Sequence, residues 1–316
     1  MISSQETAPN GKPVKISVVM IDGGFREGIF GADSFSRQDF PADEYEVIWV
    51  EYFGRPHPGL ARYPKVDVQP LGRDGVYHSS YCFNHGIRRA RGELIVIPDA
   101  DQIVRPDFLA RVWELHQAYD KLAIYGYRYD EVEQGLLASH DFDELERRCV
   151  LKNPTNYGGC LTARKKWLLE VNGYEQHPIF RTGNHANGLD MFTRFKNLGL
   201  AIQWEPSLRL YHPWHPFTLQ RTLEHEAQEK LVQWRRQNVQ WLALEGIDPG
   251  RNADPPERVA RMLQRTLREL ETSPSDGRGR GDGKGAARAT NGTASAARPS
   301  FLRRSLRRLL RVRDPG

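Results

Sequence analysis

Cysteine is scarce in this sequence, and the few that occur are scattered. The 316 residues contain only Cys82, Cys149 and Cys160, and no two of them have C-x-x-C spacing. Structural zinc sites and disulfide frameworks need several cysteines at short, regular spacing. The pattern therefore argues against both kinds of site, and it is typical of a protein that works in a reducing compartment.

Long hydrophobic runs are also missing. No stretch of 18 uninterrupted apolar residues occurs, and the first residues, MISSQETAPNGKPVK, lack the apolar segment of a secretory signal. A membrane-spanning helix needs about 20 mostly apolar residues, and a signal peptide needs a shorter apolar core. We therefore expect neither of these, and we expect a cytoplasmic protein.

Positive charge is concentrated at one end of the chain. The formal net charge is +5, but residues 272–316 hold eleven Arg and Lys against three Asp, so the remainder carries −3. The basic character thus belongs to the tail. With 39% hydrophobic residues, the remainder is long enough for one domain of about 200–250 residues with appendages.

Short runs of β-formers alternate with helical stretches. Apolar runs typical of a sheet covered on both faces occur at residues 14–20, 44–51, 93–98 and 121–130. Residues 77–92 have helical spacing, and Pro106 suits the start of another helix. This succession predicts an α/β fold with an open, mostly parallel sheet flanked by helices.

The third apolar run ends at two aspartates, Asp99 and Asp101, in the sequence PDAD. Two carboxylates at the end of a buried strand repel each other unless a cation lies beside them. Because ligands of such sheets bind beyond the carboxyl ends of the strands, a divalent metal that carries a diphosphate is one interpretation. The other is an ordinary polar turn with an aspartate as helix N-cap.

The order of several motifs resembles the family 2 glycosyltransferases of the GT-A fold. Matching positions in the helix before the aspartates and in the segment after them are Asn84, Gly86, Ile87, Ala90, Gly92, Gly158, Gly159, Arg164, Asn172, Gly173 and Tyr174. The resemblance covers roughly residues 14–212. It implies an enzyme that moves a sugar from a nucleotide-diphosphate donor, here a UDP-sugar, to an acceptor hydroxyl.

The resemblance also implies which residues contact the donor and the metal. Asp101 would hold Mn²⁺ or Mg²⁺, and Asp99 would lie nearer the ribose. Glu51 would take the role of the acid that contacts the base, with the alternative of a solvated strand end. Asn84, in the matching helix, is a further expected donor contact. The loop after the first strand, IDGGFREG, departs from the family pattern. Asp22 in this loop is a candidate donor contact, and the alternative is a plain flexible turn.

A histidine-containing segment, SLRLYHPWHP, supplies one more candidate ligand. His212 ends a predicted strand and is similar to the third metal ligand of several GT-A enzymes, whereas His215 follows three residues later. The alternative is a histidine packed in an aromatic loop.

The catalytic base is where the sequence departs from the family. The expected acids are replaced by Asn187 and Gly188, and an amide cannot accept a proton at neutral pH. Asp190 and His185 remain as candidates, since an unperturbed imidazole has a pKa of about 6.5. Asp190 could equally be the i,i+4 partner of Arg194.

The rest of the chain is divided by composition. We expect an N-terminal extension at 1–13, a catalytic domain at 14–216, a helical extension at 217–271 and a disordered linker at 272–298. Residues 299–316 read as a basic amphipathic helix for an anionic membrane surface, such as the inner face of the cell membrane. A solvated tail, or one that binds nucleic acid without specificity, is the alternative.

These features favour a metal-dependent, inverting glycosyltransferase that acts on a saccharide or glycolipid acceptor, with no specific nucleic-acid partner. Apolar residues at helical spacing predict one long amphipathic helix over 217–246, which would pack on the catalytic domain or form a homodimer contact. Two alternatives stay open. One is a noncatalytic nucleotide-sugar-binding homologue that has lost the base, and the other is a nucleotidyltransferase, against which the Gly158–Tyr174 segment argues.

Overall fold

The computed structural model describes residues 13–24, 28–133, 141–181, 186–215 and 223–272. The chain divides into two units, Met1–Pro274 and Ser275–Gly316, and all described elements lie in the first. The predicted helix at 299–316 and the predicted linker from residue 273 onward lie outside the described residues.

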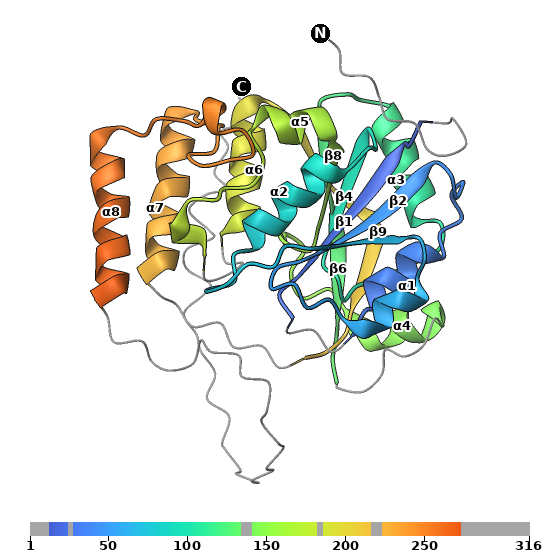
Figure 1. The fold of residues 1–316 in the computed structure, drawn as a ribbon. Helices are drawn as coiled ribbons and strands as arrows, with labels where there is room; N and C mark the ends of the chain where they lie inside the picture. Colours follow the sequence, from blue (N-terminus) through green and yellow to red (C-terminus); the bar gives the residue numbers. More distant parts are fainter. Residues whose placement is uncertain (1–12, 25–27, 134–140, 182–185, 216–222, 273–316) are drawn as a thin grey trace, which may run out of the picture. The chain divides into compact units, whose positions relative to one another are not determined.

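A mixed, mostly parallel sheet forms the centre of the first unit (Figure 1). Its strands are β1 (Ile16–Asp22), β2 (Tyr45–Glu51), β3 (Val66–Pro70), β4 (Leu94–Pro98), β5 (Ile103–Val104), β6 (Leu122–Glu131), β7 (Cys149–Val150), β8 (Cys160–Arg164) and β9 (Ala201–His212). Their order is β3-β2-β1-β4-β8-β6-β9-β5, with β7 paired to β6. Strands β8, β5 and β7 run antiparallel to their neighbours.

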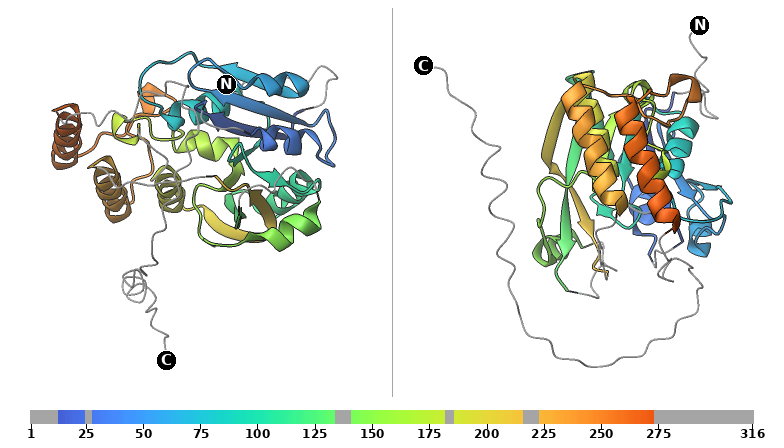
Figure 2. Two further views of the ribbon diagram at one scale, coloured as in Figure 1. Left: turned by 90° about the horizontal axis from the view of Figure 1, so that it is seen from below. Right: turned by 90° about the vertical axis from the view of Figure 1, so that its left-hand side faces the viewer.

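Helices cover both faces of this sheet, as predicted (Figures 1 and 2). The helices are α1 (Phe30–Ser36), α2 (Ser79–Arg89), α3 (Phe108–Gln117), α4 (Phe142–Arg148), α5 (Lys165–Glu170), α6 (Asn187–Leu198), α7 (Leu223–Asn238) and α8 (Glu257–Thr272). Three short 3-10 helices, η1 (Pro58–Arg62), η2 (Pro178–Phe180) and η3 (Pro249–Arg251), lie in the connections.

Alternate residues of the central strands explain the two covered faces. Val18 and Met20 of β1 pack with Phe35 of α1 and with α3, whereas Val19 and Ile21 pack with α2, α5 and α6. Successive strand residues point to opposite faces. A strand buried on both sides therefore reads as a continuous apolar run, which is why these strands are recognisable in the sequence.

The C-terminal helices α7 and α8 pack against η2 through a separate apolar cluster. Ala227 and Leu231 of α7 and Val259 and Leu263 of α8 are buried with Phe180 of η2. Helices α7 and α8 lie side by side in Figure 2 (right). No helix among those described has the length and apolar character needed to cross a bilayer.

The single long helix expected over 217–246 is wrong in length. Helix α7 ends at Asn238, and Val239 takes a left-handed φ of 50°. The chain then turns back, so that Ala243 N–H donates to Val171 O (3.1 Å) and Ile247 N–H donates to Asn172 O (3.0 Å). Trp241 and Leu242 fit a helical period, but these tertiary hydrogen bonds override it.

Candidate active site

Polar side chains meet at the carboxyl edge of the sheet. Asp22, Glu51 and His212 are the last residues of β1, β2 and β9, and Asp101 lies just beyond β4. The short strand β5 pairs antiparallel with β9, with Ile103 opposite Tyr211. This pairing brings the loop that contains Asp101 against the end of β9, although more than a hundred residues separate the two segments in sequence.

Asp101, His212 and His215 form a group that could hold a metal ion, with one ligand atom of each within 4.8 Å of the others. His212 Nε2 lies 3.7 Å from Asp101 Oδ1, and His215 Nε2 lies 3.9 Å from Asp101 Oδ2. The two histidine Nε2 atoms are 3.3 Å apart. The Asp101 and His212 side chains are 10% and 12% exposed, and that of His215 is 46% exposed.

These distances fit a single ion. For octahedral coordination at about 2.1 Å, adjacent ligand atoms are about 3.0 Å apart and opposite ones about 4.2 Å apart. The observed separations of 3.3, 3.7 and 3.9 Å, the last two to different oxygens of Asp101, lie between these two values, so small side-chain shifts would bring the three groups to one ion. One carboxylate and two imidazoles make a mixed oxygen and nitrogen donor set, of the kind that divalent transition metals accept.

Two charged residues of β6 lie behind this group. Asp130 Oδ1 is 3.1 Å from His212 Nδ1 and 3.0 Å from Arg128 Nε. Arg128 Nη1 also lies 3.5 Å from Asp99 Oδ2. Burial alone would raise the pKa of Asp130, but the hydrogen bond from His212 and the charge of Arg128 hold this pKa below its usual range.

The carboxylates of Asp22 and Glu51 are buried and shape their own loops. Asp22 Oδ1 accepts a hydrogen bond from Gly24 N–H (3.0 Å). Glu51 accepts from Phe53 N–H (2.9 Å) and Arg55 N–H (2.5 Å), and it has no exposed surface. The two residues are register partners at the ends of β1 and β2. Both residues therefore lie at the carboxyl edge of the sheet, as predicted, and the hydrogen bonds to Glu51 stabilise the turn that follows β2.

Asn84 makes a structural bridge. Its side-chain Nδ2 donates to Tyr174 O (2.8 Å), and its Oδ1 accepts from Tyr174 N–H (2.7 Å). The two residues before Tyr174, Asn172 and Gly173, have φ angles of 64° and 71°, so the chain turns sharply there. Asn84 is buried, and these contacts use both ends of its amide, so they favour a structural role over the predicted donor contact.

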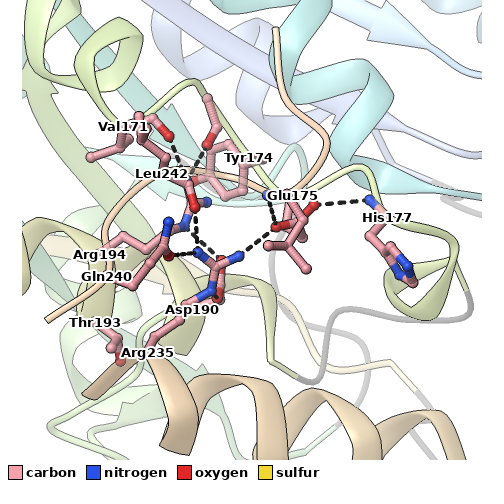
Figure 3. A network of polar contacts seen from close by, with 12 residues as sticks. Val171, Tyr174, Glu175, His177, Asp190, Thr193, Arg194, Arg235, Gln240 and Leu242 are labelled. Carbon is pink, nitrogen blue, oxygen red and sulfur yellow. Dashed lines mark hydrogen bonds and ion pairs between the residues drawn. The ribbon is translucent and has the colours of Figure 1, made fainter. Parts of the chain in front are cut away.

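Asp190 is enclosed in a buried network of charges (Figure 3). Its carboxylate lies 2.7 Å from Arg194 Nε and 2.9 Å from Arg235 Nε, and all three side chains are at most 1% exposed. Arg235 also pairs with Glu175 at 2.5 Å, and Arg194 donates to two backbone carbonyls. Burial lowers the pKa of Arg235, although the two carboxylates oppose this shift.

This network favours the interpretation of Asp190 as the partner of Arg194 rather than as a catalytic base. A general base must reach the acceptor hydroxyl, and the Asp190 carboxylate faces two guanidinium groups in the interior. The other base candidate, His185, lies outside the described residues.

Residues 187 and 188, where the family has its acids, make other contacts in this structure. Asn187 Nδ2 donates to Ser79 Oγ (2.7 Å) in the interior. A Cβ added at Gly188 would lie 2.3 Å from the Tyr157 carbonyl oxygen. No side chain fits at residue 188 unless the segment around Tyr157 moves, so the backbone itself excludes an acid there.

Two features of the site were not predicted. His215 joins the possible metal ligands, and the H-x-x-H spacing with His212 was the signal for it. The contact between Asp130 and His212 follows from the β6–β9 register, in which these residues are opposite each other. Nothing in a single sequence indicates that register.

Residues 78–173 match the family model described as glycosyl transferase family 2. The match includes the helix α2, the two aspartates after β4 and the turn before Tyr174. The predicted resemblance to this family is confirmed over that segment. No curated protein matches the chain.

Several solved structures share the fold. The structure of S. aureus TarS residues 1–349 in complex with UDP aligns with a TM-score of 0.54 and 15% identity, over 84% of this chain and 74% of that chain. GalNAc-T7 with UDP, GalNAc and Mn²⁺ aligns with a TM-score of 0.52 and 12% identity, over 70% and 48% of the two chains. The predicted GT-A fold is confirmed by these alignments.

Proposed function

We propose that this protein is a metal-dependent glycosyltransferase. It would transfer a sugar from a nucleoside diphosphate donor, in our proposal a UDP-sugar, to a hydroxyl of a saccharide or glycolipid with inversion at the anomeric carbon. The observation that carries the proposal is the cluster of Asp101, His212 and His215 at the carboxyl edge of a GT-A sheet. UDP in the TarS complex, and UDP with Mn²⁺ in the GalNAc-T7 complex, support the donor and metal.

In this proposal the residues at the sheet edge hold the donor. Asp101, His212 and His215 would bind Mn²⁺, which neutralises the charge that develops on the leaving diphosphate. Asp99 lies beside them, next to Arg128, and would approach the ribose. Asp22 and Glu51 would fix the loops after β1 and β2 that border the nucleotide.

We assign the proton transfer to His185. The acceptor oxygen would attack the anomeric carbon while its proton passes to the imidazole, and the bond from that carbon to the diphosphate would break. The support is chemical. Asn187 is an amide, residue 188 has no side chain, and Asp190 is turned toward two arginines, whereas an imidazole titrates near neutral pH.

A second candidate function is a noncatalytic protein that binds nucleotide sugars. The close approach of Tyr157 O to Gly188 favours it, because this contact excludes the usual acid from the site. The two functions predict the same donor binding and differ only in transfer.

An assay of nucleotide release separates them. The purified protein is given a panel of UDP- and GDP-sugars with Mn²⁺, Mg²⁺ or EDTA, in the presence and absence of oligosaccharide and glycolipid acceptors. We expect one donor to be turned over with Mn²⁺, faster when the correct acceptor is present. If donors bind with metal but no nucleotide is released under any condition, the noncatalytic function is the correct one.

The partners and location of the protein are also proposals. We place it at an anionic membrane surface, held on the cytoplasmic side by residues 299–316, where a glycolipid acceptor would be at hand. The support is the basic, leucine-rich sequence SFLRRSLRRLLRVR at the end of the chain. A homodimer through α7 and α8 remains part of the proposal, although both helices already bury apolar residues against the catalytic unit.

A further inference from the structure

Five charged or titratable side chains form a continuous line of contacts at the candidate metal site. Asp99 contacts Arg128 (3.5 Å), Arg128 contacts Asp130 (3.0 Å), and Asp130 contacts His212 (3.1 Å). His212 then faces Asp101 at 3.7 Å. The line begins and ends in the loop after β4, and it passes through β6 and β9.

The contact between Asp130 and His212 determines which imidazole nitrogen is available. His212 Nδ1 faces Asp130, so this nitrogen carries the hydrogen and donates it to the carboxylate. The lone pair is thereby left on Nε2, and Nε2 is the atom near Asp101 and His215. A histidine that binds metal commonly donates its other ring N–H to a carboxylate, which fixes the ring and makes the ligating nitrogen more basic.

Asp130 is itself held in place. It stands directly opposite His212 in the register of β6 and β9, so both backbones are fixed by sheet hydrogen bonds. Arg128 contacts the same Oδ1 atom that accepts from His212. The Asp130 side chain is 14% exposed and that of Arg128 is 27% exposed, so water competes less for these contacts than it would at an open surface.

We propose that Asp130 is a positioning residue for the metal site and that it acts through His212. It holds the imidazole ring with Nε2 toward Asp101, while Arg128 steadies Asp130 and ties it to Asp99. This inference rests on the metal-dependent function proposed above. It adds to that function a residue of β6 that touches neither the donor nor the metal.

The test is a double-mutant cycle on Mn²⁺ affinity, measured by loss of the EPR signal of free Mn²⁺ with no donor or acceptor present. Asp130→Asn should weaken Mn²⁺ binding by about 10–100-fold. In a His212→Ala background the same change should alter the affinity by less than about 3-fold, because the residue through which Asp130 acts is gone. Asp130→Glu keeps the carboxylate and should recover part of the loss.

Asp67→Asn is the matched control. Asp67 is a strand carboxylate of β3 that pairs with Arg89 at 2.9 Å, away from the candidate site, and its loss should leave Mn²⁺ affinity unchanged. Thermal unfolding of each variant identifies a loss of fold. If Asp130→Asn destabilises the protein, the Mn²⁺ affinity of Asp130→Glu is compared with that of the wild type and of His212→Ala. This comparison then tests whether Asp130 acts through His212.

Each outcome bears on one claim. An equal loss of affinity in the wild-type and His212→Ala backgrounds would mean that Asp130 acts only as a nearby negative charge, and would overturn the inference. Unchanged affinity in Asp130→Asn would also overturn it, while leaving the proposed function intact. A wild-type protein that binds no Mn²⁺ would overturn the metal site itself, and the inference with it.

Discussion

Two i,i+4 ion pairs of this protein join the same residue types in very different surroundings. Asp190 and Arg194 are 2.7 Å apart and at most 1% exposed. Asp33 and Arg37 are 2.9 Å apart, with the arginine 64% exposed. Breaking a buried pair by removing one partner leaves an uncompensated charge in the interior, whereas an exposed pair contributes little.

We therefore predict that Asp190→Asn lowers the free energy of unfolding by about 3–5 kcal/mol. Asp33→Asn, the matched control, should lower it by less than about 1 kcal/mol. Urea unfolding of both variants and the wild type measures this difference. If Asp190→Asn leaves stability unchanged but reduces sugar transfer by about 10²–10⁴-fold at constant donor affinity, Asp190 is the base after all.

At the scale of elements, the segment after α7 is tied to the turn that precedes Tyr174. Glu175 accepts hydrogen bonds from Leu244 N–H (2.8 Å) and Glu245 N–H (2.9 Å) and pairs with Arg235 of α7. Asn172 donates to Asp248 O (3.0 Å) and accepts from Asp248 N–H (2.7 Å). The turn that matches the family pattern therefore anchors the C-terminal segment.

We predict that a chain ending at residue 216, the predicted end of the catalytic domain, will not fold cooperatively. Its Glu175 would lose Arg235 and remain without an ion-pair partner, and Asp190 would keep Arg194 but lose its second guanidinium. A chain ending at residue 274, where the first unit ends, should unfold at the same temperature as the full chain. Circular dichroism melts of the three proteins measure this. A cooperative transition for the shorter chain would show that α7 and α8 are dispensable.

At the scale of the whole molecule, the sheet and its carboxyl edge could be predicted because their signals are local. Buried parallel strands are recognisable as apolar runs, Asp101 lies just beyond one of them, β4, and His212 ends the strand β9. The pairing of Asp190 with Arg194 could be predicted from their i,i+4 spacing. The bridge from Asn84 to Tyr174 and the contact of Asp190 with Arg235 could not, since these partners lie 90 and 45 residues away in sequence. The helix period could not reveal the turn at Val239 for the same reason.

The proposed membrane contact also belongs to this scale. Deleting residues 296–316 removes seven arginines and the leucines between them, and each basic residue near an anionic surface contributes about 1 kcal/mol to binding. We predict that the truncated protein no longer sediments with anionic liposomes, while its turnover of an unanchored oligosaccharide acceptor is unchanged. Liposome binding that survives the deletion would place the membrane contact elsewhere or remove it.

The central claim is that a metal at Asp101 holds the diphosphate of a nucleotide donor. Isothermal titration of UDP into the wild type and into Asp101→Ala, with Mn²⁺ and with EDTA, tests it most directly. We predict that Mn²⁺ strengthens UDP binding to the wild type by at least about 10-fold, that Asp101→Ala abolishes this gain, and that Asp67→Ala retains it. Equal UDP affinity with and without metal in the wild type would contradict the claim.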